Sequence, residues 1–435
     1  HSDSSGRNAS HPADLFADRP SGQPASSFSG TPFRLDAVRR QQIATLRSML
    51  EHQLHESVLP FWVRHSPDPE HGGMFNCLNR DGSVYDTRKN VWLLGRQVWM
   101  LSRLQLDGAG RPEWMDLAAT GMRFLREHAV EPDGRCWFAL TREGKPLWRQ
   151  RKIFSECFYV MALAGYAHAS GESAPLREAE ELLERIWTWS EDLRLVGAPV
   201  YEGAPASQSL AVPMILLNLI EEVVGPGDHS RFNPQVEACV ERMLLHVDRQ
   251  RRVVRELVAP DGSPIDSIEG RLLNPGHAIE AGWFLQSWAR RLGREELSRT
   301  AAQMVRWSME RGWDGEYGGL FYFLDVEGYS PVQLEWDMKL WWPHNEAMVA
   351  FAHNLLAEGL EQDWADFLKV TNYALERFPD PEHGEWFGYL NRRGEVTHRF
   401  KGGPYKGCFH VPRSLHLCCG LLDQIQNAFD PEAGA

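Results

Sequence analysis

A short glycine-bounded segment recurs along the chain at intervals of roughly 60 residues, and this repeat limits the folds available to the chain. Each copy combines turn residues, an aromatic-rich stretch and a second turn containing glycine, which is typical of a short β-hairpin. Apolar residues at helical spacing fill the gaps between copies. The copies lie at 68–86, 131–144, 253–262, 314–328 and 380–394, with a weaker one at 193–201. The repeat unit is therefore predicted to be two helices plus a hairpin.

Six such helix pairs can either stack as an open array or close into a ring. Glycines flanking the expected helix starts, at Gly95, Gly276 and Gly407, and aromatic-rich hairpins on one side favour a ring around a cavity. We therefore expect an all-α fold, an (α/α)6 barrel of twelve helices with short β-hairpins on one rim. A single domain is expected over residues 35–430. Residues 1–34, rich in Ser, Gly, Pro and Asp, are expected to form a disordered or loosely attached tail.

Composition excludes several classes of partner. The formal net charge of −13 disfavours nucleic acid and anionic membranes, because both require clustered Lys and Arg. No apolar run approaches the roughly 18–20 residues of a membrane span. The seven cysteines are scattered without a CxxC pair, which fits reduced thiols. A cytoplasmic protein acting on a small molecule is expected.

Two glycine- and proline-rich segments each deliver a histidine to the expected start of a helix. Residues 401–413 contain three glycines and two prolines, which rule out a regular helix or strand and lead to His410 and Arg413. The second segment, 274–284, begins Asn274-Pro275-Gly276-His277. Histidine can act as acid or base near neutral pH, and a guanidinium can hold a carbonyl or alkoxide oxygen in place. A single loop histidine is more often structural, so the argument rests on the pair.

Polar residues should converge on one cavity if the hairpins and loops share a rim. Glu280 lies three residues after His277, so on a helix it can orient that imidazole or raise its pKa. Arg96 follows the apolar Trp92-Leu93-Leu94 and is expected to face the cavity, with a surface salt bridge as the alternative. The further rim candidates are Tyr85, Arg88, Trp92, Lys152, Glu156, Asn274, Trp341, His344, Glu346 and Tyr405, although a single aromatic residue more often belongs to the core.

Other chemistries find less support in the residues. His277 and Glu280 with a remote histidine could ligate zinc, but no second close pair completes the ligand set, so no metal is expected. Cys408 and His410 are two residues apart, which turns the side chains away from one another and disfavours a Cys/His nucleophile. No phosphate-binding glycine loop and no GxSxG motif occurs.

Eight segments resemble the N-acylglucosamine 2-epimerase family, also described as renin-binding protein, and the resemblance covers nearly all of residues 45–425. They are SPDPEHGGMF, VWLLGRQVWM, RKIFSECFYVMA, LAVPMILLNL, NPGHAIEAGWF, QLEWDMKLWWPHNEAM, DPEHGEWFGYL and KGGPYKGCFHVPR. The resemblance implies an (α/α)6 barrel that interconverts N-acetyl-D-glucosamine and N-acetyl-D-mannosamine, a sialic acid precursor. It also implies a homodimer, no cofactor for the chemistry, and ATP as an allosteric activator that is not consumed.

The resemblance also implies roles for individual residues. The two catalytic histidines of the family correspond to His277 and His410, and its active-site arginine corresponds to Arg96. Glu346 and Arg413 match two further residues of the family's site. Two histidines suit a 2-epimerase, because a base on each side of C2 can remove and return its proton after the sugar ring opens.

Three alternatives remain open at this stage. Cellobiose and mannose enzymes share the fold and both histidines. The cellobiose epimerases, however, carry a third histidine at the position that matches Pro213 of this chain, which favours the N-acyl sugar branch. A glycoside hydrolase could use Glu280 and Glu346 as its carboxylate pair. A binding protein without catalysis would not need a histidine at both rim loops.

Overall fold

The computed structural model describes residues 30–430 and confirms the prediction of paired helical rings. The first helix runs continuously through α1 (Ala37–His52), a π-helical segment η2 (Gln53–Val58) and α2 (Leu59–His65). Counting that run once, the described residues contain the twelve helices expected. Two 3₁₀ turns, η3 (Leu193–Val196) and η4 (Ser230–Phe232), interrupt the connections.

Six helices form a closed inner ring. Each contacts the next along the chain, and the last contacts the first, so the open array is excluded. Because these helices are covered on both faces, buried residues occur around most of their circumference. The inner helices are α3 (Val91–Leu106), α5 (Phe154–Ser170), α7 (Ala211–Val224), α9 (Pro275–Leu292), α11 (Trp341–Glu358) and α13 (His410–Ala428).

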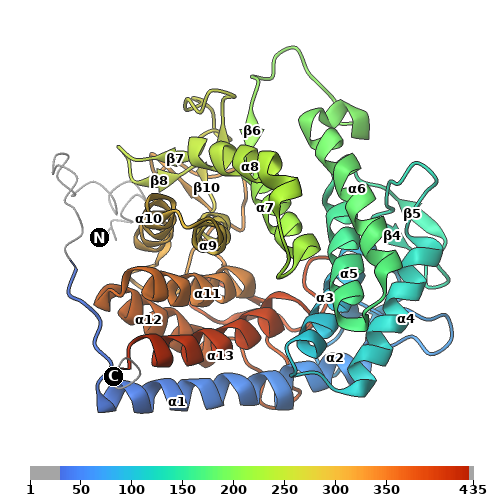
Figure 1. Ribbon diagram of the computed structural model, residues 1–435, viewed down its shortest axis with the longest axis horizontal. Coiled ribbons are helices and arrows are strands. Elements are labelled where there is room, and N and C mark those ends of the chain that lie inside the picture. The colour runs from blue at the N-terminus through green and yellow to red at the C-terminus, as the bar shows by residue number, and fades with distance from the viewer. Residues whose placement is uncertain (1–29, 431–435) are drawn as a thin grey trace, which may run out of the picture.

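The outer ring consists of amphipathic helices that each bury one face on the inner ring. Figure 1 shows α1 beside α13 and α12 beside α11, and these pairs are in contact. With the α1–α2 run, the outer helices are α4 (Pro112–His128), α6 (Ser173–Glu191), α8 (Asn233–Leu245), α10 (Glu295–Gly312) and α12 (Glu361–Arg377).

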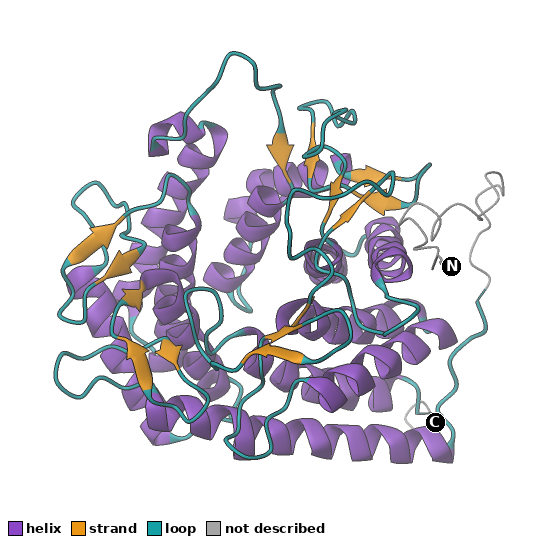
Figure 2. Ribbon diagram, turned by 180° about the vertical axis from the view of Figure 1, so that it is seen from behind, coloured by secondary structure: helices purple, strands orange, loops and turns teal. Residues whose placement is uncertain are grey.

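Short antiparallel strands lie at the ends where the inner helices begin, in front of the helices in Figure 2. Several pairs join neighbouring repeats, and β3, β10 and β12 lead directly into α3, α9 and α11. The pairs are β1 (Cys77–Leu78) with β2 (Val84–Asp86), β6 (Gln208–Ser209) with β9 (Leu257–Val258), β7 (Val247–Asp248) with β8 (Val253–Val254), and β10 (Leu272–Leu273) with β11 (Leu324–Asp325). Two three-stranded sheets contain β3 (Lys89–Asn90), β4 (Ala139–Leu140) and β5 (Pro146–Trp148), and β12 (Lys339–Leu340), β13 (Tyr389–Leu390) and β14 (Val396–His398).

Three repeats share a buried set of one aspartate, one lysine and one arginine. The aspartate precedes the hairpin, the lysine comes from the segment leading into the inner helix, and the arginine comes from the hairpin tip of the next repeat. In each set both cations contact the carboxylate, so the set fastens neighbouring repeats together. The three sets are Asp68 with Lys89 and Arg142, Asp314 with Lys339 and Arg392, and Asp380 with Lys401 and Arg80.

The last Asp–Lys–Arg set closes the ring. Arg80 lies in the first repeat and donates to both oxygens of Asp380 in the sixth, at 2.7 and 2.9 Å. In the set of the fifth repeat, burial disfavours the ionised carboxylate, but the two cations outweigh burial and lower the pKa of Asp314 to about 2.

The packed part of the chain begins before residue 35. Phe33 is 4% exposed, and its N–H donates to the Gly359 oxygen at 2.7 Å. The last residues assigned to the tail are therefore attached to the α11–α12 turn, whereas residues 1–29 lie outside the described range. Among helices of residues 30–430, none is both long and apolar enough to cross a membrane.

Candidate active site

The two sequence-predicted histidines lie at the first turns of two inner helices and flank one tryptophan. His277 sits in the first turn of α9, where the Asn274 side chain caps the helix by accepting from the His277 N–H at 3.1 Å. His410 is the first residue of α13. Both imidazoles contact the Trp342 ring of α11, with centroids 5.2 Å and 5.9 Å away. Two histidines 133 residues apart in the sequence thus meet at one tryptophan.

His410 is held by a buried carboxylate. Its Nδ1 lies 2.7 Å from Oε1 of Glu346, which also accepts from Arg413 at 2.6 Å, while Oε2 accepts from Trp283 at 2.8 Å. Burial opposes ionisation of Glu346, but Arg413 and His410 outweigh it and lower its pKa to about 2. An ionised carboxylate can only accept, so the proton of neutral His410 resides on Nδ1 and the Nε2 lone pair is free.

Burial makes His410 a neutral imidazole at physiological pH. Loss of hydration lowers its pKa to about 4, and the positive charges of Arg413 and Arg96 act in the same direction against the attraction of Glu346. A neutral imidazole with a free nitrogen can accept a proton, so His410 is equipped as a base.

His277 has the opposite bias. Its Nδ1 lies 3.1 Å from Oε2 of Glu256, and about a third of its side chain (32%) is exposed. Burial disfavours the imidazolium, but Glu256 foremost, and Glu280 at longer range, outweigh burial and raise the pKa of His277. Two titratable groups whose environments drive their pKa values apart are suited to act as an acid and a base.

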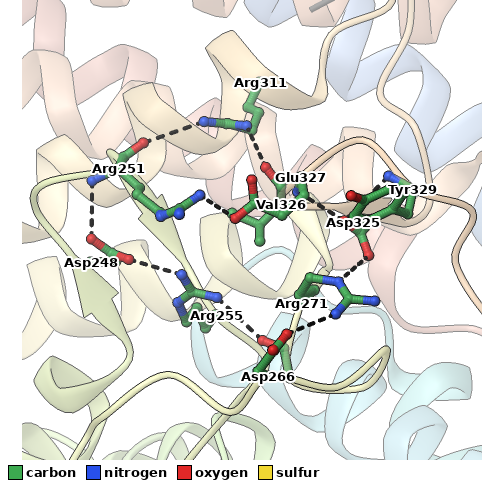
Figure 3. A network of polar contacts seen from close by, with 11 residues as sticks. Asp248, Arg251, Arg255, Asp266, Arg271, Arg311, Asp325, Val326, Glu327 and Tyr329 are labelled. Carbon is green, nitrogen blue, oxygen red and sulfur yellow. Dashed lines mark hydrogen bonds and ion pairs between the residues drawn. The ribbon is translucent and has the colours of Figure 1, made fainter. Parts of the chain in front are cut away.

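Glu256 was missed by sequence reasoning, although the hairpin that carries it was recognised. It lies between β8 and β9, and a polar network fixes its neighbours (Figure 3). Arg255 donates to Asp248 at 3.0 Å, and Arg271 of the adjoining strand pair bridges Asp266 and Asp325. An isolated carboxylate in a hairpin usually faces solvent, so the sequence alone carries little signal for its role.

Glu280 is not the hydrogen-bond partner of His277 that its spacing suggested. It accepts from Nη2 of Arg413 at 2.8 Å, and the same nitrogen donates to Glu346. Burial and the nearby charge of Glu346 raise the pKa of Glu280. The helix spacing does place Glu280 on the side of His277, but the guanidinium from α13 binds it, and Glu256 holds the imidazole.

Arg96 faces this cluster from α3, with its guanidinium among aromatic rings. Its guanidinium lies 4.0 Å from the centroid of the Phe158 ring and 4.9 Å from those of Trp92 and Phe409. Among the described residues its Nε has no hydrogen-bond partner. Burial is the main reason that its pKa falls to about 9. A charged donor held in an aromatic cage is suited to receive an anionic oxygen.

Several predicted rim residues surround the 401–409 loop rather than the histidines. Trp92 donates from Nε1 to the Pro404 oxygen at 3.2 Å, and Tyr85 donates to the Gly402 oxygen at 3.0 Å. Tyr405 is 64% exposed and its ring lies 6.3 Å from that of Trp92. These aromatic residues form the wall beside the site.

The tryptophan beside the two histidines is Trp342, not the predicted Trp341. The Trp341 ring is 3% exposed, packs on Tyr389 at 5.2 Å, and reaches His410 only at 6.5 Å. Trp342, which was not singled out, contacts both histidines. Consecutive helical residues point about 100° apart, so a choice between them requires the phase of the helix.

Other candidates are engaged elsewhere. The Glu156 side chain is fully buried, and its Oε1 accepts from Arg135 at 2.6 Å and from the Cys136 N–H at 2.9 Å. Glu156 therefore forms a structural ion pair and exposes no surface to a substrate. Lys152 is exposed, and its backbone oxygen accepts from the same arginine.

Three further residues are also structural. His344 is fully buried, contacts the Leu340 oxygen through Nδ1 at 2.6 Å, and accepts from the Leu320 N–H at 2.9 Å. Arg88 pairs with Asp86 at 2.7 Å. Cys408 is buried, which raises the pKa of its thiol far above the range of a nucleophile.

A metal ion is a poor fit to the central cluster. The ligand atoms of Glu280, Glu346 and His410 do lie within 4.8 Å of one another. The Arg413 guanidinium, however, donates to both carboxylates and already supplies positive charge between them. This donor set is neutralised by the protein itself.

Fold and site together define an acid/base enzyme built on an (α/α)6 barrel, and comparison with known proteins identifies its family. The sequence model of the N-acylglucosamine 2-epimerase (GlcNAc 2-epimerase) family matches residues 73–411. N-acylglucosamine 2-epimerase from Bos taurus is 46% identical over 398 residues, covering 89% of this chain and 94% of the bovine protein. The Homo sapiens protein of the same name is 44% identical, covering 91% of this chain and 95% of the human one.

Solved structures show the same fold. Cellobiose 2-epimerase from Spirochaeta thermophila superposes with a TM-score of 0.77 at 23% identity, covering 90% of this chain and all (100%) of that one. The chain belongs to the N-acylglucosamine 2-epimerase family, a family of carbohydrate epimerases, which are isomerases. The resemblance seen in the sequence motifs is thereby confirmed.

Proposed function

We propose that this protein interconverts N-acetyl-D-glucosamine and N-acetyl-D-mannosamine. The observation that carries the proposal is the pair of histidines with opposite protonation bias on either side of Trp342, at the site of a chain 46% identical to a relative named for this reaction. Inversion at C2 needs one group to take a proton and another to give one. The catalytic roles below follow from this geometry.

The reaction begins with the open-chain sugar, because only the aldehyde can delocalise the electrons released at C2. His410 accepts the C2 proton on Nε2, the C2–H electron pair forms a C1=C2 double bond, and the carbonyl pair moves to O1 to give an enolate, since C2 carries the acetamido nitrogen. His277 then returns a proton to C2 from its protonated ring, on the opposite face. In the reverse direction the two histidines exchange roles, which follows from microscopic reversibility.

Charged groups stabilise the oxygen that becomes negative. Arg96 is the first choice as donor, because it is positive and desolvated, and its Nε has no hydrogen-bond partner among residues 30–430. Arg413 is the second choice, but Glu280 and Glu346 already engage its Nη2. Removing such a donor costs on the order of 10²–10³ in rate. The sequence of proton transfers is complete without a metal or a redox cofactor.

Glu256 and Glu346 orient the two bases. Each accepts from Nδ1 of its histidine and so leaves the other ring nitrogen toward the cavity. Asn274 fixes the start of the helix that carries His277. Tyr85, Trp92 and Tyr405 would contribute to the substrate-facing wall, whereas the buried Trp341 would support it from behind.

The neighbouring chemistries fit the site less well. Pro213, in the first turn of α7, occupies the position at which cellobiose epimerases are expected to carry a third histidine. A cellobiose 2-epimerase from Ruminococcus albus is only 23% identical to this chain. A glycoside hydrolase needs one protonated and one free carboxyl group. The pKa of Glu280 is raised and that of Glu346 is lowered, but one nitrogen of Arg413 donates to both carboxyl groups and occupies the space between them.

Further properties are proposed from the family alone. The barrel, residues 35–430, would be the catalytic domain of a cytoplasmic homodimer that supplies or consumes a sialic acid precursor. ATP would activate it without being consumed. Light scattering of the purified protein tests the dimer, and a non-hydrolysable ATP analogue that activates as well as ATP tests the role of the nucleotide.

The central test is proton NMR of N-acetylmannosamine with the protein in D₂O, with and without ATP. The expected product is N-acetylglucosamine carrying deuterium at C2, because the donating histidine exchanges its proton with solvent. Turnover of mannose or cellobiose in its place would move the protein to a neighbouring activity. A lack of turnover with all three sugars would contradict the proposal and leave a binding protein.

A further inference from the structure

A buried lysine, Lys406, fixes the loop that precedes His410. Lys406 is fully buried, its Nζ donates to the Lys401 oxygen at 3.0 Å, and its own oxygen accepts from the Gly403 N–H at 2.9 Å. The ammonium lies 5.9 Å from the ring centroids of both Trp62 and Trp341. Lys406 therefore joins the loop to the first outer helix and to the start of α11, which carries Trp342 and Glu346.

The partner of Lys406 is a glutamate in an unfavourable backbone conformation. Glu385 is fully buried and its Oε1 lies 3.3 Å from Nζ of Lys406. Its φ is +56°, a left-handed value that is uncommon for a residue with a Cβ atom. The same carboxylate accepts from the Trp386 N–H at 2.6 Å and from Trp62 Nε1.

Two sister repeats solve the same backbone problem with glycine. Five residues after the buried aspartate, the first repeat has Gly73 with φ +68° and the fifth has Gly319 with φ +79°. Glycine adopts such values without strain. The backbone at position 385 would therefore accept glycine, and the hairpin is already fastened by Asp380 and Lys401. What Glu385 adds is its carboxylate, and that carboxylate holds Lys406.

We propose that Glu385 and Lys406 form a positioning pair that fixes the 401–409 loop and thereby holds the His410 imidazole against Glu346 and Trp342. The strain at Glu385 is retained because the ion pair serves the loop rather than the hairpin. Trp341 transmits the same restraint, since its ring contacts both Lys406 and His410. As a statement about catalysis the inference rests on the proposed function, whereas the placement of His410 can be measured without substrate.

The test replaces the pair by neutral residues that suit the local structure. In the double variant Glu385→Gly and Lys406→Met, position 385 gains the residue of the sister repeats and no buried charge is left unpaired. We expect kcat to fall tenfold or more with a smaller change in KM, because a displaced base slows the proton transfer. The single variant Lys406→Met leaves the Glu385 carboxylate its two N–H donors. Its kcat should also fall, and it replaces the double variant in the test if that variant does not fold.

A second readout follows the imidazole itself. His410 is surrounded by Glu346 from α11, Glu280 from α9, Arg96 from α3 and Arg413 from its own helix. A loosened loop would admit water to His410, so its pKa should rise from about 4 toward the ordinary value, and the acid limb of the rate profile should move to higher pH. NMR titration of labelled histidine measures this without sugar, so it decides the inference even if the wild type has no epimerase activity.

The control is a buried ion pair of the outer ring. Arg306 of α10 donates to Asp363 of α12, at 2.6 and 2.9 Å, and also pairs with Glu358, the last residue of α11, twelve residues after Glu346. Arg306→Met with Asp363→Asn should lower the melting temperature while kcat and the His410 titration stay at wild-type values. The inference is overturned if the Glu385/Lys406 variant keeps kcat within threefold of wild type with an unchanged His410 titration, or if the control variant loses as much activity.

Discussion

Replacing Arg96 with methionine should make the protein more stable and nearly inactive. The fall of its pKa from 12.5 to about 9 corresponds to about 5 kcal/mol by which the folded protein disfavours the charged guanidinium, because the attraction of Glu280 and Glu346 offsets only part of the lost hydration. That figure is an upper limit, because the side chain is partly exposed to the cavity. Contacts with the three aromatic rings return about 0.5–1 kcal/mol each.

The difference leaves at most about 2–3.5 kcal/mol by which Arg96→Met should raise the free energy of unfolding, measured by urea denaturation with a linear extrapolation. The same variant should lose on the order of 10²–10³ in kcat, because the enolate oxygen would lose its donor. Activity and stability are thus expected to move in opposite directions.

Arg242→Met is the matched control, because this arginine of α8 pairs with Glu191 on the outer surface at 2.8 Å. An exposed pair contributes about 0–1 kcal/mol, so its removal should not stabilise the protein, and kcat should be unchanged. An Arg96→Met variant that unfolds at the same or a lower urea concentration than wild type would refute the reasoning, since the guanidinium would then be compensated in the free protein.

The remaining predictions concern the two histidines and their carboxylates. His277→Ala and His410→Ala should each lower kcat by about 10²–10⁴ with an unchanged circular dichroism spectrum, and a variant retaining a tenth of the wild-type rate would exclude the two-base scheme. The pH profile of kcat/KM should rise as His410 loses its proton near its pKa of about 4 and fall as His277, whose pKa is raised, loses its own. Glu256→Gln removes the carboxylate that raises the His277 pKa, so the alkaline limb should move to lower pH while the acid limb stays. Glu346→Gln should move the acid limb to lower pH and reduce kcat, and an unmoved limb would show that Glu346 does not act on His410.

The fold could be predicted because its units are local. Each hairpin is marked by glycines at positive φ, such as Gly82 and Gly144, and each helix pair by apolar spacing, so neither requires knowledge of distant contacts. His410 and His277 could be placed at one site for the same reason: both follow a glycine- and proline-rich segment and lie in the first turn of an inner helix.

The partners of these histidines could not be predicted in the same way. Glu256 meets His277 because a separate strand pair is packed beside α9, and that packing leaves no periodic trace in the sequence. Glu280 has the right spacing but is bound by an arginine 133 residues away. Glu156 shows the converse, since its place at the start of an inner helix suggested the cavity, yet Arg135 of the preceding hairpin pairs with it. Local spacing limits which residues can meet, and tertiary competition decides which of them do.

The ring closure also has a consequence for the order in which the chain can fold during synthesis. Arg142 meets Asp68 only 74 residues back, so the first two repeats can associate soon after they leave the ribosome. Arg80 and Asp380 are 300 residues apart, and Trp62 and Glu385 are 323 apart. The seam-facing side of the first helix thus has no partner until nearly the whole barrel has been translated. At roughly 5–20 residues per second that wait lasts tens of seconds, during which the nascent ring exposes one apolar edge.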